Sequence, residues 1–245
     1  MHLKKGSIVR PVFSWFSKKK SPPETSPGGS EILRYESPSG PRIGLTKERA
    51  QFAEARESVY TRHFGEAIKV WHELIPLIPH VDVFTYVRQH EGRDFYTLIT
   101  GGMSDLEMTL PVEAKGAARR VELIFYCWEA KEEYLKTIQW LAHFPHNYKT
   151  WIGPGHTLPT ENIPAPLWGS PVLNMILFIP TILKSDATMS DELTLAGEPV
   201  DFLWVVPLTT PECDLKLEKG SKAIFDLFNL HHHPFVFDPN RKSYV

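Results

Sequence analysis

Three side chains of the sequence have the types and spacing of an iron site. His80 and Asp82 stand two residues apart in a stretch that alternates as a β-strand does, so both would point to one side. His156 could add a second imidazole and complete the two-histidine, one-carboxylate triad of an iron oxygenase. Such oxygenases commonly also need a cation after the distal histidine, yet residues 150–183 contain neither Lys nor Arg. We therefore favour a structural interpretation, in which His80 hydrogen-bonds a loop and Asp82 faces a neighbouring strand or cation.

A serine in a glycine turn is the second candidate for chemistry. Gly102-Met-Ser-Asp-Leu106 is one residue short of the Gly-x-Ser-x-Gly nucleophile elbow of hydrolases, because Leu106 replaces the second glycine. The residues that follow lack the helical periodicity that an elbow needs. We therefore favour a polar turn, with positive φ at Gly101 and Gly102 and with Ser104 and Asp105 bonding nearby backbone amides. Ser104 and Asp105 could also belong to a recognition surface.

The segment Trp151-Ile-Gly-Pro-Gly-His-Thr157 is shaped by its glycines, which permit a close approach of the backbone. Thr157 could fix the His156 ring through a local hydrogen bond. Because one histidine in a glycine turn more often organises a loop than binds a ligand, we keep a structural and a binding role open for both residues.

The remaining histidines and the two cysteines have simpler explanations. Successive residues of His231-His-His233 point in different directions, so at most two could share an ion, and cations near a helix C-terminus account for them. Cys127 lies among aromatic residues, which indicates a buried, inert thiol. With Cys213 it forms no CxxC pair and no disulfide framework, which favours a reducing cytoplasm. We expect neither a metal nor a cofactor.

The elements that must position these residues do not follow a strict alternation of strands and helices. We predict a hairpin from 80–88 and 95–100, and three strands that are apolar on both faces, at 121–128, 172–179 and 200–206. Helices are predicted at 47–63 with Thr46 as N-cap, at 131–144 and near 214–230. Neither a Gly-x-Gly-x-x-Gly motif nor a P-loop follows a strand. The sequence therefore predicts one α+β domain with a mixed, largely antiparallel central sheet flanked by helices.

Residues 1–45 have a composition that opposes folding. Residues 21–30 are rich in Pro, Gly and Ser and cannot bury enough apolar surface to offset their ordering entropy. We predict a disordered tail over 1–45 and a domain over 46–245. Apolar residues between Ile8 and Phe16 recur at helical spacing among lysines, so a weak anchor to a membrane surface or a partner is the alternative. That run is too short to span a membrane.

Charge is divided between the two parts. Residues 1–45 hold eight Lys or Arg and three Glu, a net +5, so the other 200 residues carry −7. An acidic body argues against nucleic acid as the main partner, because phosphate binding needs a cationic face. The expected partner is a protein, and a basic one would suit the charge.

Taken together, the polar segments resemble the suppressor-of-fused domain. Members typically carry a short His-x-Asp strand, a Gly-Met-Ser-Asp turn and a Gly-His-Thr element in this order, matched here at 80–82, 102–105 and 155–157. The resemblance covers Thr46 to the C-terminus. It implies a protein-binding module with the α+β fold predicted above.

Two functional classes remain in view. In animals the related domain restrains a transcription factor of the Hedgehog pathway, and bacterial relatives are suspected immunity proteins that neutralise secreted toxins. A stand-alone copy of this length is similar to the bacterial type, because it lacks room for the animal protein's second domain. The other class is a metal-dependent enzyme that uses the iron triad. We favour the binding module, with candidate binding residues His80, Asp82, Ser104, Asp105, His156 and Thr157.

Overall fold

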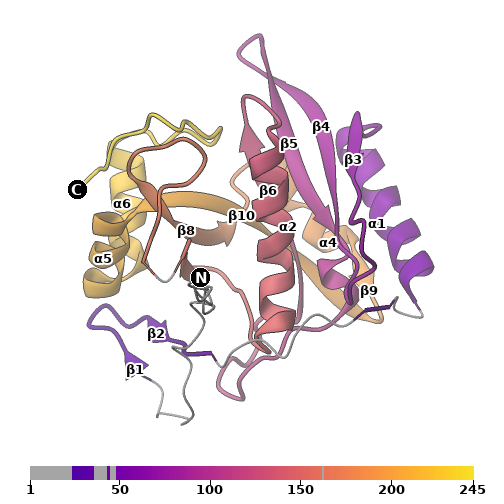
Figure 1. The fold of residues 1–245 in the computed structure, drawn as a ribbon, viewed down its shortest axis with the longest axis horizontal. Coiled ribbons are helices and arrows are strands. Elements are labelled where there is room, and N and C mark those ends of the chain that lie inside the picture. The colour runs from indigo at the N-terminus through magenta and orange to yellow at the C-terminus, as the bar shows by residue number, and fades with distance from the viewer. Residues whose placement is uncertain (1–23, 36–42, 45–47, 162) are drawn as a thin grey trace, which may run out of the picture.

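An eight-stranded β-sheet forms the centre of the molecule (Figure 1). The computed structural model describes residues 24–35, 43–44, 48–161 and 163–245. The strands of the sheet are β3 (Lys69–Trp71), β4 (Asp82–His90), β5 (Arg93–Gly101), β6 (Arg120–Cys127), β7 (Thr157–Pro159), β8 (Leu173–Pro180), β9 (Thr194–Leu195) and β10 (Glu198–Thr209). Their order is β3-β4-β5-β6-β10-β8-β7, with β9 paired to β10. Only β6 and β10 run parallel among these strands, so the predicted mixed, largely antiparallel sheet is confirmed.

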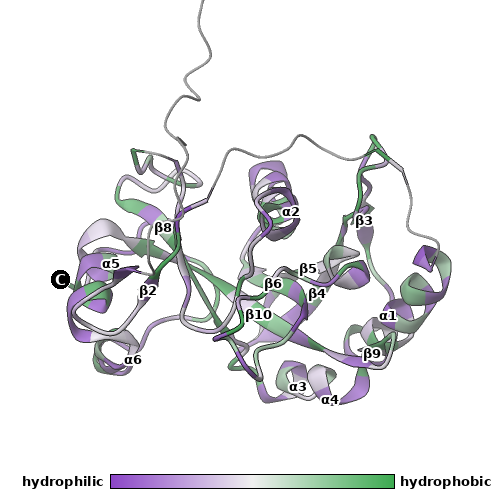
Figure 2. Ribbon diagram, turned by 90° about the horizontal axis from the view of Figure 1, so that it is seen from below, coloured by the Kyte–Doolittle hydropathy of each residue, from purple (hydrophilic) through white to green (hydrophobic). Residues whose placement is uncertain are grey.

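Helices cover both faces of this sheet, as an α+β fold requires. They are α1 (Arg49–Phe64), α2 (Glu132–Asn147), α3 (Lys184–Ala187), α4 (Met189–Glu192), α5 (Thr210–Lys219) and α6 (Ser221–Leu230), with a 3-10 turn η1 at Met103–Asp105. Figure 2 shows α2 on one side of the strands and α3 and α4 on the other. Thr46, the predicted N-cap of the first helix, lies outside the described residues. None of the described helices is both long and apolar enough to cross a membrane.

The central strands feed two separate cores. In β6, Leu123 and Phe125 belong to the core under α2, whereas Ile124 and Tyr126 belong to the core on the opposite face. Because alternate residues of a strand point to opposite sides, a strand covered on both faces is apolar at nearly every position. Every residue of β6 is buried, as the sequence predicts.

The predicted hairpin is β4 and β5, joined by Glu91 and Gly92. These two residues have φ angles of 52° and 76°, the combination of a type I′ turn, whose twist matches that of the flanking strands. The register sets Asp82 opposite Gly101. The start of β4 therefore lies beside the glycine turn that follows β5.

The predicted single helix near 214–230 is wrong, because Gly220 divides it. Gly220 adopts φ 85° and ψ 168°, which ends α5 and begins α6. Helix α5 starts with a capping box. The Thr209 hydroxyl accepts from the Glu212 backbone N–H, while the Glu212 carboxylate accepts from the Thr209 N–H. A left-handed glycine is a frequent helix terminator, so Gly220 marks a boundary rather than a weak point within one helix.

A short hairpin near the N-terminus contacts the domain. It consists of β1 (Glu24–Thr25) and β2 (Glu31–Ile32), and at its tip Gly28 donates its N–H to the Leu217 carbonyl at 2.7 Å. A Cβ at Gly28 would lie 2.2 Å from the Gly220 nitrogen, so only glycine fits. Residues 1–23, 36–42 and 45–47 lie outside the described residues. The disordered tail over 1–45 stays a prediction. Within that range, residues 24–35 have defined neighbours in the structure.

Candidate functional site

His80 and Asp82 lie together where β4 begins. The His80 Nε2 and Asp82 Oδ1 atoms are 3.1 Å apart, and the two side chains are 10% and 13% exposed. Asp82 also accepts a hydrogen bond from the Glu73 backbone N–H at 3.0 Å and lies 3.2 Å from His72 Nδ1. Asp82 thus ties the segment before β4 to the strand itself.

Glu73 completes this polar anchor from the other end of the segment. Its Oε1 is 2.6 Å from His143 Nε2 on α2, and its Oε2 accepts from the Val81 N–H at 3.3 Å. The same Oε2 is 3.6 Å from His80 Nδ1. Residues 72–79, which we call the 72–79 loop, are therefore held at both ends by mostly buried polar contacts.

The 72–79 loop presents apolar side chains to solvent. Leu74 is 95% exposed and Ile75 is 60% exposed. Leu77 forms a β-bridge with Ile43, which is also exposed. A rigidly held loop that exposes neighbouring aliphatic side chains has the features of an interaction surface.

The Gly-Met-Ser-Asp turn lies directly against His80. Gly102 has φ 123°, and a Cβ there would lie 1.9 Å from the His80 carbonyl oxygen, so the turn requires glycine. Gly101 belongs to β5 and lacks the positive φ that the sequence suggested. The structure therefore brings two of the three polar motifs into contact through Gly102 and His80.

Glu122 on β6 explains why this turn is polar. Its Oε1 accepts from the Gly102 N–H at 2.9 Å, from the Ser104 N–H at 3.0 Å and from the Ser104 hydroxyl at 2.5 Å. Its Oε2 accepts from the Thr100 hydroxyl at 2.6 Å. Ser104 is fully buried, so its side chain supports the loop from within.

Asp105 is buried next to this carboxylate. It forms an ion pair with Arg56 of α1, whose Nε also lies 3.8 Å from a Glu122 oxygen. Burial, only partly opposed by the Arg56 charge, raises the pKa of Asp105 to about 6. Arg120 donates to the Ser104 and Asp105 carbonyls at 2.7 and 3.0 Å. The expected bonds from Ser104 and Asp105 to backbone amides are replaced by contacts with charged side chains of α1 and β6.

His156 belongs to a different environment. Its ring lies 4.3 Å from the Trp151 ring, and burial, reinforced by the Lys216 charge, lowers the pKa of His156 to about 4. The Thr157 hydroxyl interacts with the Cys213 thiol and not with the His156 ring as expected. Among the described residues no three His, Cys, Asp or Glu side chains are placed so that they could hold a metal ion together, so His80, Asp82 and His156 do not assemble the iron triad.

The other histidines and the thiols are structural. The His231 ring stacks on Tyr244 with centroids 4.5 Å apart, and His233 stacks on Phe228 at 4.0 Å. Burial lowers the pKa of His233 to about 3, so this one of the three rings is neutral and is not a cation at the helix end. Burial also raises the pKa of the Cys127 thiol to about 12, which leaves it protonated and unreactive.

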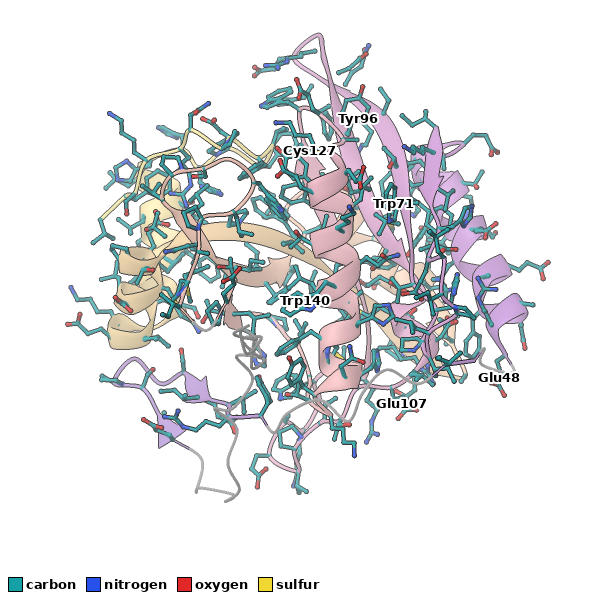
Figure 3. The ribbon with its side chains drawn as sticks, viewed as in Figure 1. Glu48, Trp71, Tyr96, Glu107, Cys127 and Trp140 are labelled. Atoms are coloured by element: carbon teal, nitrogen blue, oxygen red, sulfur yellow. The ribbon has the colours of Figure 1, made fainter. Side chains whose placement is uncertain are left out.

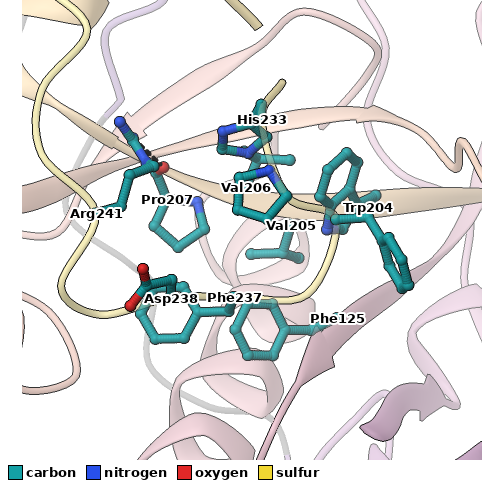
Figure 4. A pocket seen from close by; sticks show the side chains of 11 residues that line it. Phe125, Trp204, Val205, Val206, Pro207, His233, Phe237, Asp238 and Arg241 are labelled. Carbon is teal, nitrogen blue, oxygen red and sulfur yellow. Dashed lines mark hydrogen bonds between the residues drawn. The ribbon is translucent and has the colours of Figure 1, made fainter. Parts of the chain in front are cut away.

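Two hollows in the described part of the chain differ in volume. One, of about 10 Å³, is closed by the C-terminal segment with His233, Phe237 and Arg241 and has room for at most a single water (Figure 4). The other is a groove of about 310 Å³ between α2 and residues 160–167, with Trp140 on its wall. Only the second has the volume of a binding site.

The residues that sequence reasoning missed are the partners of the polar motifs. Glu122 gave a signal, since it is the one charged residue in the apolar run 121–128. Glu73 belongs to the 72–79 loop and precedes its exposed aliphatic residues. His143 lies on the apolar face of α2, where a buried polar side chain requires a partner. Arg56 gave no comparable signal, because an arginine within a charged helix normally faces solvent.

The fold and these contacts define a class of α+β protein in which short polar motifs anchor loops to a mixed sheet. The chain belongs to the suppressor of fused (SUFU) family, whose sequence profile matches residues 78–242. All six predicted binding residues lie within that match. The family resemblance of the sequence is therefore confirmed.

Solved structures show the same fold at low sequence identity. A SUFU homologue from Neisseria gonorrhoeae is similar with a TM-score of 0.60 and 17% identity, over 80% of this chain and 98% of that one. SUFU in the Sufu–Fu complex gives a TM-score of 0.50 and 12% identity, over 84% and 93%. Drosophila Suppressor of Fused gives 0.51 and 11%, over 78% of this chain and 50% of that one. A comparison with curated protein sequences gave no match.

Proposed function

We propose that this chain is a non-enzymatic protein-binding module of the cytoplasm, and that it neutralises a basic toxin domain as an immunity protein. The observation that carries protein binding is the 72–79 loop, in which Leu74 and Ile75 are exposed while Glu73 and Asp82 fix the backbone. Exposed aliphatic side chains gain free energy when a partner covers them, and a fixed loop loses little entropy on binding.

The family and the charge support the same role. A relative has been solved as the Sufu–Fu complex, which is an assembly of two proteins. Residues 46–245 carry a net charge of −7, which would speed the encounter with a basic partner. A toxin domain that acts on nucleic acid would have such a charge, because it must bind phosphates.

The candidate binding residues divide into two groups under this proposal. Ser104 and Asp105 have no accessible side-chain surface and act by supporting the turn against His80 and Asp82. His156 and Thr157 are partly exposed and could contact a partner through a second loop. The weak membrane contact of the N-terminal segment stays an alternative for residues outside the described part of the chain.

Co-expression with a toxic domain encoded beside this gene tests the proposal. The chain should restore growth and co-purify with that domain, whereas Leu74→Asp and Ile75→Asp should lose both without a change in thermal midpoint. Val112→Asp is the matched control, because Val112 is 80% exposed on a different loop.

The outcomes test the loop as a binding interface and the immunity role separately. Rescue and co-purification that persist in both loop variants would show that the 72–79 loop is not the interface. Failure of the native chain to bind or rescue against any domain encoded beside it would remove the immunity role.

A further inference from the structure

The groove beside α2 is lined mainly by apolar side chains, with Lys136 and Glu161 as its charged residues. Trp140 of α2 is 43% exposed and forms one wall, and Leu167 and Ile176 line the opposite side. Figure 3 labels Trp140 beside α2. A volume of about 310 Å³ is sufficient for a large aromatic side chain.

The walls of this groove are fixed in place. The Thr160 hydroxyl donates to the Ala165 carbonyl at 2.8 Å and accepts from the Ala165 N–H at 3.0 Å, which closes the loop between them. The Trp168 indole N–H donates to the Thr137 hydroxyl at 3.0 Å and joins the end of that loop to α2. A preformed site binds its occupant without a cost of rearrangement.

Trp140 is the uncovered end of an aromatic row on α2. Trp140, Phe144 and Tyr148 follow each other at intervals of one helical turn, with ring centroids 5.7 and 4.7 Å apart. Tyr35 of the N-terminal segment covers the far end, 5.3 Å from Phe144 and 6.0 Å from Tyr148. The chain thus already uses an aromatic residue of its own N-terminal part to cover this row.

The preceding residues start within reach of the groove. Glu24 pairs with Ile32 in the β1–β2 hairpin, and only two residues, about 10 Å of chain, separate Ile32 from Tyr35. Phe16 stands eight residues before Glu24, a span of up to about 26 Å when extended. This span is comparable with the path from Glu24 through Ile32, Tyr35 and Phe144 to the Trp140 ring.

The charges on the two sides are complementary. Trp15 and Phe16 are followed by three lysines at 18–20. Glu161 lines the groove beside Lys136, and Glu132 and Glu133 lie about one helical turn before Lys136 on α2. These three rim glutamates outnumber Lys136, which is itself paired with Glu132 at 2.5 Å. Opposite charges beside an apolar anchor fix its register and speed its docking.

We infer that residues 13–20 bind in this groove within the same molecule, with the Trp15-Phe16 pair against Trp140 and with the lysines beside the rim glutamates. The bound segment covers the last exposed ring of the aromatic row. A partner, or an anionic surface that attracts the lysines, must compete with this groove for the segment.

Limited trypsin digestion of the full chain measures the docking. Trypsin cleaves after the lysines at 18–20 when the segment leaves the groove, so Trp140→Ala should raise the cleavage rate there about tenfold. Trp15→Ser combined with Phe16→Ser should have the same effect. Phe225→Ala, which removes a 40% exposed ring on α6, is the matched control. Cleavage rates that are equal in all four chains would overturn the inference.

Crosslinking and vesicle binding identify the occupant. A carbodiimide should join the lysines at 18–20 to Glu132, Glu133 or Glu161 within one molecule, and Trp140→Ala should abolish these crosslinks. Crosslinks found only between two molecules would assign the groove to a second copy and overturn the inference. Trp140→Ala should also bind phosphatidylserine vesicles more tightly than the native chain, because the segment is released. Equal vesicle binding would show that the groove does not hold it.

Discussion

Ser104 donates both its hydroxyl and its backbone N–H to one oxygen of Glu122, at 2.5 and 3.0 Å. The acceptor lies on the next strand of the sheet, eighteen residues further along the chain. Ser104, which resembles a nucleophile in the sequence, is therefore a buried donor that stabilises the buried Glu122 carboxylate.

Removal of this hydroxyl should destabilise the protein without affecting any surface. Ser104→Ala leaves the buried Glu122 with one donor fewer, which should cost about 1–3 kcal/mol in the free energy of unfolding. Urea denaturation measures the change. Ser58→Ala, at an exposed position of α1, is the control and should shift the free energy of unfolding by less than about 0.5 kcal/mol. A loss no larger than that of the control would contradict the anchoring role.

Stability should depend on the protonation of His156. Its pKa in the folded protein, about 4, lies below the ordinary value of 6.5, so the unfolded chain binds a proton more tightly. The stabilisation is fully present above about pH 6.5 and is lost as the pH falls toward 4, by up to about 3 kcal/mol. His156→Gln should remove this part of the pH dependence, and the exposed His90→Gln should not. Parallel stability profiles for the native chain and His156→Gln between pH 4 and 7 would rule the effect out.

Two parts of the N-terminal region should contribute separately to thermal stability. Removal of residues 1–23 releases the groove and should lower the thermal midpoint by about 2–4 °C, the shift expected for about 1 kcal/mol in a domain of this size. Removal of residues 1–35 also takes away Tyr35 and the Gly28 contact, so the midpoint should fall further. The contribution of the Tyr35 ring alone is measured with Tyr35→Ala, and Tyr35→Phe, which keeps the ring, is the control. Identical midpoints for the native and both shortened chains would instead support the disordered tail predicted over 1–45.

The purified protein should contain no stoichiometric metal. His80 has Glu73 and Asp82 as partners, whereas His156 lies against Trp151, so the two histidines cannot share an ion. Elemental analysis of protein prepared without chelators measures the content. One iron or zinc per chain, lost in both His80→Ala and His156→Ala while the fold is retained, would restore the enzyme hypothesis.

The sequence predicted the sheet better than it predicted the site. The strands at 121–128, 172–179 and 200–206 were recognisable because two covered faces require apolar residues at nearly every position. The role of Ser104 was not recognisable, because its environment depends on Glu122 and Arg56, which are distant in the chain. Gly220 was assigned to a helix interior because periodicity continues across it, while its backbone conformation depends on packing against Gly28.

The parallel pairing of β6 with β10 has a consequence for synthesis of the chain. β10 lies between β6 and β8, and seventy residues separate the end of β6 from the start of β10. While the ribosome makes those residues, one edge of the mostly apolar β6 has no partner strand. Unpaired apolar edges associate with other chains, and contacts between distant segments form slowly. Assembly of the sheet must therefore wait until β10 has emerged from the ribosome, and the chain is most prone to aggregate in the interval before β10 inserts.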